Sequence, residues 1–153
     1  MTSPDNLLAG AEFAEPAATS LAATRQHGST LYASGQIAVR DGKLLATGLV
    51  GDQVDVATAQ RCAWQCAHNL LTAVRAELGS LDEISSVLRL GVYVASADGF
   101  TDQPLVAHGA SRLMLDVLGP VAGAHTRTAI GVRALPLGTP VEVDAIFSTR
   151  SPR

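Results

Sequence analysis

Segments with strand-like and helix-like spacing of apolar residues interleave along this chain, and their order restricts the fold more than any other feature. Strand-like alternation covers residues 30–38, 43–47, 84–95, 126–133 and 141–148. Helix-like spacing covers residues 52–78 and 101–118. The resulting order β-β-α-β-α-β-β favours an α+β fold with one sheet that carries both helices on one face.

The expected helix ends rest on capping residues. Asp52 is the predicted N-cap of the first helix, with Asp55 in its first turn, and Gly79 is its predicted C-cap. The second helix is expected to begin at Thr101 and to end at Gly119-Pro120. Its expected buried stripe consists of Val106, Ala110, Leu113 and Val117.

Length and composition indicate one domain with a real core. The chain has 153 residues, of which 47% are hydrophobic and 16% charged, so disorder is not expected. Residues 1–18 show no clear period and are interpreted as an arm or a loosely packed strand before a domain at residues 19–150. The net charge of −3, with scattered Lys and Arg, argues against an electrostatic nucleic-acid surface. No signal peptide or membrane-length apolar run is evident, so we expect a cytoplasmic protein without a membrane partner.

Cys62 and Cys66 lie four residues apart, and His68 follows them. This spacing permits a metal site, but a structural zinc site normally shows a second pair of ligands. Cys66 also belongs to the apolar stripe of the first predicted helix, which explains it without chemistry. We therefore predict two packing cysteines, with no metal and no disulfide.

Arg127 is the main candidate for ligand binding. It shares one face of its predicted strand with the small residues Ala129 and Gly131, which would leave space beside the guanidinium. A planar guanidinium with room around it suits bidentate carboxylate binding. The four histidines are isolated, and the chain has no Gly-rich phosphate loop, no Gly-x-Ser-x-Gly sequence and no His-Glu-x-x-His sequence.

Two carboxylates complete this interpretation. Glu142 and Asp144 point to the polar side of the last predicted strand. We expect the last two strands to form a hairpin whose polar face carries Arg127, Arg133 and both carboxylates. The alternative is a solvated sheet face held by salt bridges, without a ligand.

Several stretches resemble the RidA (reactive intermediate deaminase) family. Ser34-Gly-Gln-Ile37 resembles a hallmark of that family, and residues 125–132, 135–138 and 140–146 resemble its C-terminal signature block. Residues 99–104 and 106–111 resemble a stretch found in a longer RidA-like subgroup. The resemblance runs in order from about Pro16 to Phe147.

This resemblance implies a chorismate-mutase-like fold and a homotrimer with ligand pockets in the clefts between subunits. It implies hydrolysis of enamines and imines, such as 2-aminoacrylate, to 2-keto acids and ammonia, with no metal or organic cofactor. Arg127 falls on the family's carboxylate-binding arginine and Glu142 on the glutamate credited with positioning or activating water. Gly35 falls on the glycine whose backbone contacts the ligand.

The chain departs from the archetypal family members at three positions in the implied site. Ala129 stands where they carry Cys, His108 where they carry Asn, and Ser20 or Leu21 where they carry Tyr. These departures favour, as the alternative to a deaminase, a non-catalytic protein of the same fold that binds a small carboxylate or acts in regulation. A third reading, endoribonuclease or translation inhibitor, comes from older names of the family and disagrees with the acidic net charge.

Overall fold

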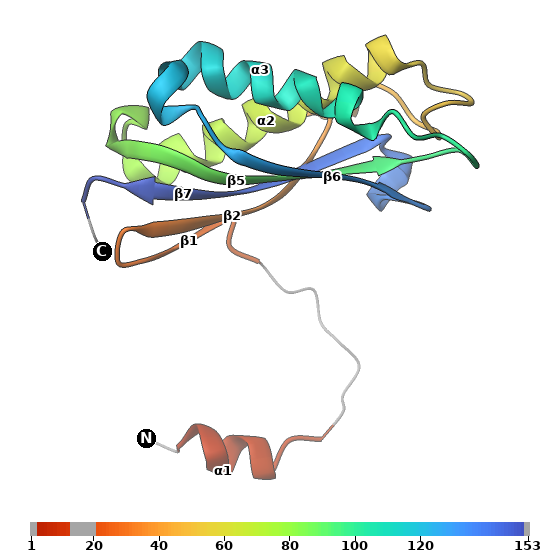
Figure 1. Ribbon diagram of the computed structural model, residues 1–153. Coiled ribbons are helices and arrows are strands. Elements are labelled where there is room, and N and C mark those ends of the chain that lie inside the picture. Colours follow the sequence, from red (N-terminus) through yellow and green to blue (C-terminus); the bar gives the residue numbers. More distant parts are fainter. Residues whose placement is uncertain (1–2, 13–20, 152–153) are drawn as a thin grey trace.

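A five-stranded mixed sheet carries two long helices on one face in the computed structural model, which describes residues 3–12 and 21–151 (Figure 1). The helices are α2 (Val56–Leu78) and α3 (Gln103–Ala122). The strand order is β1-β2-β7-β5-β6, in which only the pair β5–β6 is parallel. This arrangement confirms the predicted α+β fold. The strands are β1 (Thr24–His27), β2 (Thr30–Ile37), β5 (Ile84–Ala95), β6 (Thr126–Val132) and β7 (Val141–Thr149).

Two short additions precede α2. Strand β1 was not predicted, because its residues Thr-Arg-Gln-His show no apolar alternation; it pairs with β2 through the tight turn at Gly28, which has a φ of 56°. Strands β3 (Val39–Arg40) and β4 (Lys43–Leu44) form a separate hairpin. Asp41 and Gly42 both have positive φ in its turn, as expected for an Asp-Gly pair.

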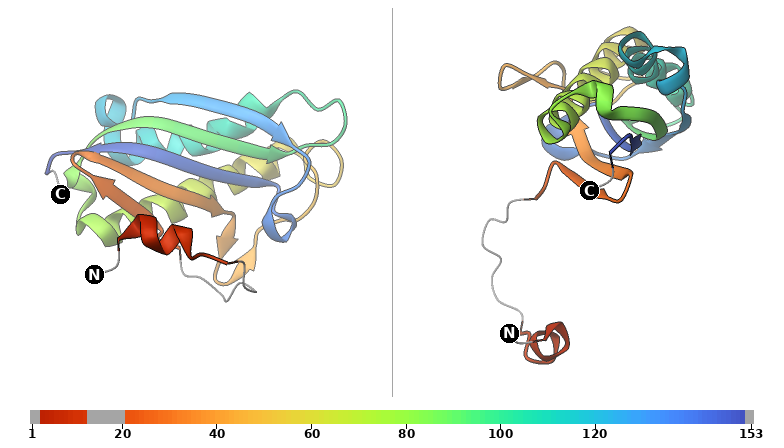
Figure 2. Two further views of the ribbon diagram at one scale, coloured as in Figure 1. Left: turned by 90° about the horizontal axis from the view of Figure 1, so that it is seen from below. Right: turned by 90° about the vertical axis from the view of Figure 1, so that its left-hand side faces the viewer.

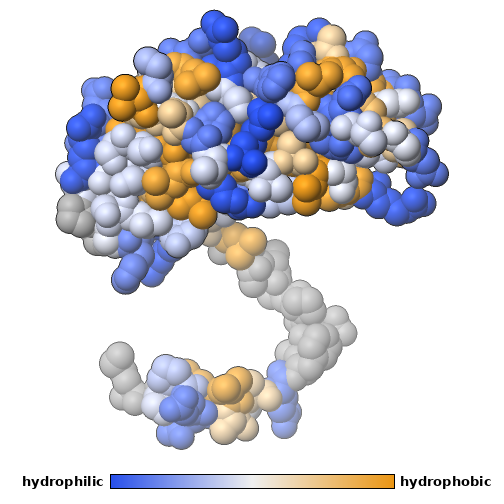
Figure 3. Space-filling model, viewed as in Figure 1, coloured by the Kyte–Doolittle hydropathy of each residue, from blue (hydrophilic) through white to orange (hydrophobic). Residues whose placement is uncertain are grey.

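The start of the chain is a short helix set apart from the body. Helix α1 (Pro4–Ala9) has Ser3 as its N-cap and contains no buried residue, where an irregular arm or a strand was expected (Figures 1 and 2). Leu7 and Leu8 are 62% and 76% exposed, and Figure 3 shows apolar atoms on this helix in the open. Ser20 lies outside the described residues, and Leu21 is exposed.

The core lies between the sheet and the two helices. Cys66, Leu70 and Val74 of α2 are fully buried against it, which confirms the predicted stripe, and Cys62 beside the stripe is fully buried as well. The N-cap of α2 is Asp55, whose carboxylate accepts from the Thr58 N–H, and not Asp52 as predicted. Gly79 is the C-cap, as predicted.

Two smaller differences from the sequence prediction concern α3 and β5. Helix α3 begins after Asp102, and Val117 is 47% exposed, because the next residue, Leu118, packs against the core in its place. In β5, irregularities of register near Val87 bury that residue and turn Leu88 outward, where strict alternation placed Leu88 inside.

Strands β6 and β7 do not form the predicted hairpin, because β5 lies between them. Helix α3 carries the chain from the end of β5 back toward its beginning, so β6 joins β5 in parallel. The segment after β6, which includes the 3-10 helix Pro136–Gly138, then leads to β7 on the other side of β5.

At Gly109, the backbones of α2 and α3 approach each other closely. A Cβ at this position would overlap the backbone carbonyl of Gln60, which cannot rotate away. We expect Gly109→Ala to lower the free energy of unfolding by about 1–3 kcal/mol, despite the better helix propensity of alanine. Thermal unfolding followed by circular dichroism measures this. Val117→Ala, at an exposed position of the same helix, should change the melting temperature much less; equal effects would contradict the tight contact.

None of the helices in the described ranges 3–12 and 21–151 is long and apolar enough to cross a membrane.

Candidate functional site

Arg127 projects from the edge strand β6 toward the helices. It pairs with the core residue Leu90 of β5, so both side chains lie on the helix side of the sheet. Its Nη1 donates to Ser111 Oγ at 2.9 Å and its Nη2 to the Pro104 carbonyl at 3.3 Å. Both acceptors are neutral, and no described carboxylate pairs with this guanidinium. Burial lowers the pKa of Arg127 below its ordinary value.

Ser111 accepts a hydrogen bond from this guanidinium and is itself bonded to His125. The sequence interpretation missed both residues. Ser111 Oγ lies 2.9 Å from His125 Nε2, and His125 Nδ1 lies 2.6 Å from the Gly123 carbonyl. Since the carbonyl can only accept, Nδ1 carries a proton there, and Nε2 can accept from the Ser111 hydroxyl. The spacing of seven residues from Pro104 to Ser111, two turns on one helix face, was the available signal.

Glu142 lies on the opposite, open face of the sheet, where it pairs with Ile37 of β2 and its carboxylate reaches over Gly35. A Cβ on Gly35 would overlap Glu142 Oε1, so only glycine lets this carboxylate lie flat against β2. The β2–β7 register shifts between Ala33 and Gln36, which places Gly35 at the irregularity. Burial first, and the neighbouring Asp144 second, raise the pKa of Glu142 above its ordinary value.

Asp144 repeats this arrangement two residues further along β7, on the same face. A Cβ on Gly91 would overlap Asp144 Oδ1, and Tyr93 Oη donates to Asp144 Oδ2 at 3.0 Å. Arg89 Nη1 lies 4.0 Å from Asp144 Oδ1. Burial and the hydrogen bond to Asp144 raise the pKa of Tyr93, which keeps its hydroxyl protonated as a donor. Asp144 is therefore already paired, whereas Glu142 is not paired in the described residues.

The predicted single polar face is therefore wrong: Arg127 and Glu142 lie on opposite faces of the sheet with β5 between their strands. On β5, Leu90 pairs with Arg127 and Tyr93 pairs with Glu142. Leu90 and Tyr93 are three residues apart, so their side chains point to opposite sides of the sheet, and each partner shares the side of the residue that it pairs with. No single ligand can reach both groups within one chain.

Of the other predicted site residues, two pack against the core or α3 and two lie exposed at the surface. Ala129 packs against the core, and the space beside Gly131 is filled by Gln103, which donates to Ser96 Oγ and to the Phe100 carbonyl. The small residues after Arg127 therefore admit α3 and do not leave the expected room. His108 is exposed on α3, on the helix face that also carries Pro104 and Ser111, which contact Arg127. Arg133 is exposed beyond the end of β6.

The two cysteines are buried in the helix layer, and Cys66 Sγ donates to the Val141 carbonyl at 3.4 Å. Burial raises the pKa of Cys62 to about 11 and that of Cys66 well above its ordinary value. Since the thiolate is the nucleophile, roughly one Cys62 in a thousand is reactive at pH 8. We expect both thiols to resist Ellman's reagent in the folded protein and to react once it is denatured. Fast reaction of either thiol under native conditions would contradict this packing.

Comparison with known proteins gives consistent matches. The family model described as Endoribonuclease L-PSP matches residues 13–148. Protein TCP17 of Trypanosoma cruzi is 42% identical over 119 residues, which are 78% of this chain and 74% of that protein. The structure of Atu1372 from Agrobacterium tumefaciens matches with a TM-score of 0.81 and 46% identity, over 83% of this chain and 81% of that one. A Shewanella oneidensis structure whose name refers to an endoribonuclease also reaches 0.81, with 27% identity over 93% of this chain and 95% of that one.

Proposed function

The chain belongs to the Endoribonuclease L-PSP family, which is the family that its motifs resemble under the name RidA, and on that premise we propose that it is an enamine and imine deaminase. Its substrates are 2-aminoacrylate-like compounds, which it hydrolyses to 2-keto acids and ammonia. The substrate carboxylate binds Arg127, and Glu142 of a neighbouring subunit handles the proton of the attacking water.

One observation carries this proposal: the partly buried Arg127 guanidinium binds only neutral oxygens in the described chain. Burial without a counter-charge disfavours a cation, as the lowered pKa of Arg127 expresses. A ligand carboxylate would supply the missing charge through two parallel hydrogen bonds. Ser111 and His125 hold the guanidinium in place, so little of its freedom is lost on binding.

The chemistry needs little beyond a carboxylate anchor and a base. The enamine form of the substrate first tautomerises to the imine. Water then adds to the carbon of the protonated imine, and Glu142 accepts the proton that water gives up. Glu142 returns this proton to the nitrogen of the carbinolamine, ammonia leaves, and the hydroxyl group loses its proton to solvent as it becomes the carbonyl of the 2-keto acid. Because its pKa is raised, Glu142 is a better proton acceptor than an exposed glutamate and remains able to return the proton.

We propose that the chain assembles into a trimer, and the same geometry supports this. Arg127 and Glu142 lie on opposite faces of one sheet, so a ligand that contacts both must sit between two copies of the chain. A closed ring of three would bring Arg127 of each copy to Glu142 of the next. Light scattering at micromolar concentration should give three times the 15.8 kDa of one chain. A monomer would contradict this assembly.

The proposed activity is tested by releasing 2-aminoacrylate from a precursor and following keto acid and ammonia in the presence of semicarbazide, which competes for the imine. The protein should divert most of the imine to keto acid. If keto acids bind but the rate is unchanged, the protein is instead a carboxylate binder. One observation favours that second function: Ala129 stands beside Arg127 where the archetypal family members carry a cysteine, so this position offers a methyl group and no reactive side chain.

Endoribonuclease activity, which the family description names, is the less favoured alternative because the net charge is −3. RNA binding through phosphate contacts would weaken steeply with salt. A filter-binding titration at several salt concentrations measures that slope.

A further inference from the structure

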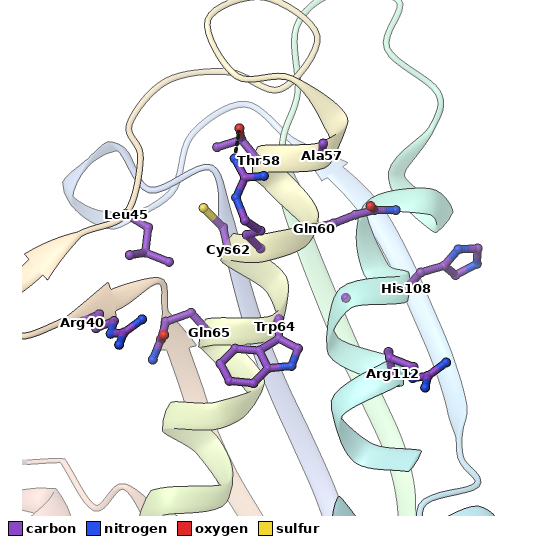
Figure 4. A pocket seen from close by; sticks show the side chains of 12 residues that line it. Arg40, Leu45, Ala57, Thr58, Gln60, Cys62, Trp64, Gln65, His108 and Arg112 are labelled. Carbon is purple, nitrogen blue, oxygen red and sulfur yellow. Dashed lines mark hydrogen bonds between the residues drawn. The ribbon is translucent and has the colours of Figure 1, made fainter. Parts of the chain in front are cut away.

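A hollow lies on the outer side of the helix layer, and neither Arg127 nor Glu142 lines it. It has a volume of about 840 Å³, within the range of small-molecule sites. Figure 4 shows Arg40 and Leu45 on the side of the β3–β4 hairpin and His108 and Arg112 on α3, with side chains of α2 between them. Trp64 is 39% exposed there, and its ring stacks on His68 at 5.4 Å.

The floor of this hollow is mainly apolar. Leu45 is 43% exposed, and Ala57 and Trp64 line the α2 side; Cys62 also borders the hollow, but its side chain is fully buried. The raised pKa of Cys62, whose side chain is buried behind the lining, keeps its thiol neutral at physiological pH, so it adds no charge to the floor. Leaving large apolar side chains in contact with water is unfavourable, so the floor favours a hydrocarbon group over water.

The rim is cationic. Arg40, Arg61 and Arg112 line the hollow together with His108, and no lining residue is a carboxylate. Arg112 is held by Asp116 through its Nε, and Arg40 lies 3.8 Å from Asp41. Arg61 donates only to the neutral Thr58 Oγ1, at 2.8 Å, and forms no ion pair with a described carboxylate.

We propose that this hollow binds an amphipathic monoanion, a carboxylate with a hydrocarbon body of about seven carbons, independently of the deaminase site. The hydrocarbon body lies along Leu45, Ala57 and Trp64. The head group binds the guanidinium of Arg61, which has further N–H donors besides the one that bonds Thr58. Charge complementarity selects an anion, and the apolar floor selects a longer chain than a keto acid carries.

The chain itself provides the reporter, because Trp64 is its single tryptophan. Octanoate should shift the emission of Trp64 to shorter wavelength in a saturable way, as the hydrocarbon displaces water from the ring. Butanoate should bind at least roughly tenfold more weakly, since it buries fewer methylenes. Octan-1-ol should also bind at least roughly tenfold more weakly, since it lacks the charge.

Two variants locate the site. Arg61→Ala should weaken octanoate binding by roughly tenfold and leave imine hydrolysis unchanged. Arg75→Ala, on the last turn of the same helix and outside the hollow, is the matched control and should bind octanoate normally. Arg127→Ala should also bind octanoate normally, which separates this site from the deaminase site.

Three outcomes would overturn the proposal. The first is no change in Trp64 emission at millimolar octanoate, and the second is equal binding of octanoate and octan-1-ol. The third concerns helix α1, whose exposed leucines and Asp5 could occupy the hollow instead. If replacing Leu7 and Leu8 with serine in the full chain shifts the Trp64 emission without ligand and tightens octanoate binding, the hollow holds the chain's own arm.

Discussion

Replacing Arg127 with alanine should weaken binding of small 2-keto acids by roughly ten- to a hundredfold, the largest binding effect expected of any single change. Hydrogen bonds to a charged group contribute about 1.5–3 kcal/mol. The variant would lose both bonds to the ligand carboxylate. The guanidinium offers a planar pair of donors, so Arg127→Lys should also bind poorly, with one point charge in place of the pair. Isothermal titration with pyruvate measures both losses.

Arg133→Ala is the matched control, because Arg133 is exposed beyond the end of the same strand. It should bind keto acids as the unmodified protein does. Ser111→Ala should have an intermediate effect, since it removes the Nη1 acceptor that orients Arg127 and leaves the charge in place. If Arg133→Ala loses binding and Arg127→Ala does not, the carboxylate anchor is on the other arginine.

Replacing Glu142 with glutamine should lower the rate of imine hydrolysis by roughly a hundredfold or more, while keto-acid binding persists. Glutamine keeps the shape that fits over Gly35 but cannot accept a proton. The unmodified enzyme should lose activity as the pH falls through the pKa of Glu142, because the protonated carboxyl is no base. Since that pKa is raised, the loss should begin at a higher pH than for an ordinary glutamate. The variant should lack this limb of the pH profile.

Stability provides the control for this variant. In the folded protein the raised pKa favours the protonated carboxyl, so the contribution of Glu142 to stability is greatest at low pH. It is lost as the pH rises through the folded-state pKa. At neutral pH, Glu142→Gln should therefore be at least as stable as the unmodified protein. A large drop in melting temperature, or an unchanged rate and pH profile, would contradict the proposed role.

Local patterns in the sequence predicted most of the elements but not their neighbours. The apolar stripe of α2 and the alternation in β7 each reflect burial on one face, which a single segment reveals. The position of β5 between β6 and β7 depends on contacts between residues far apart in the chain. A short loop between two strands suggested a hairpin, and the parallel return of the chain through α3 overrode it.

The candidate site shows the same division between local and distant information. Arg127, Glu142 and Gly35 were identifiable from motifs, but the faces to which they point were not. Arg127 shares its side of the sheet with α3, so its partner Ser111 comes from sixteen residues earlier in the chain. The close fit of Glu142 over Gly35 depends on an irregularity in the register of β2 against β7, which no periodicity reveals.

The most direct test of a site shared between subunits is complementation of two inactive variants. Arg127→Ala and Glu142→Gln are co-expressed in equal amounts with different tags, and imine hydrolysis is measured for the mixed trimers. Random assortment gives roughly three quarters mixed trimers, each with one intact site out of three, so about one quarter of the unmodified rate should return. A mixture no more active than either parent would contradict a deaminase site built from Arg127 of one subunit and Glu142 of the next.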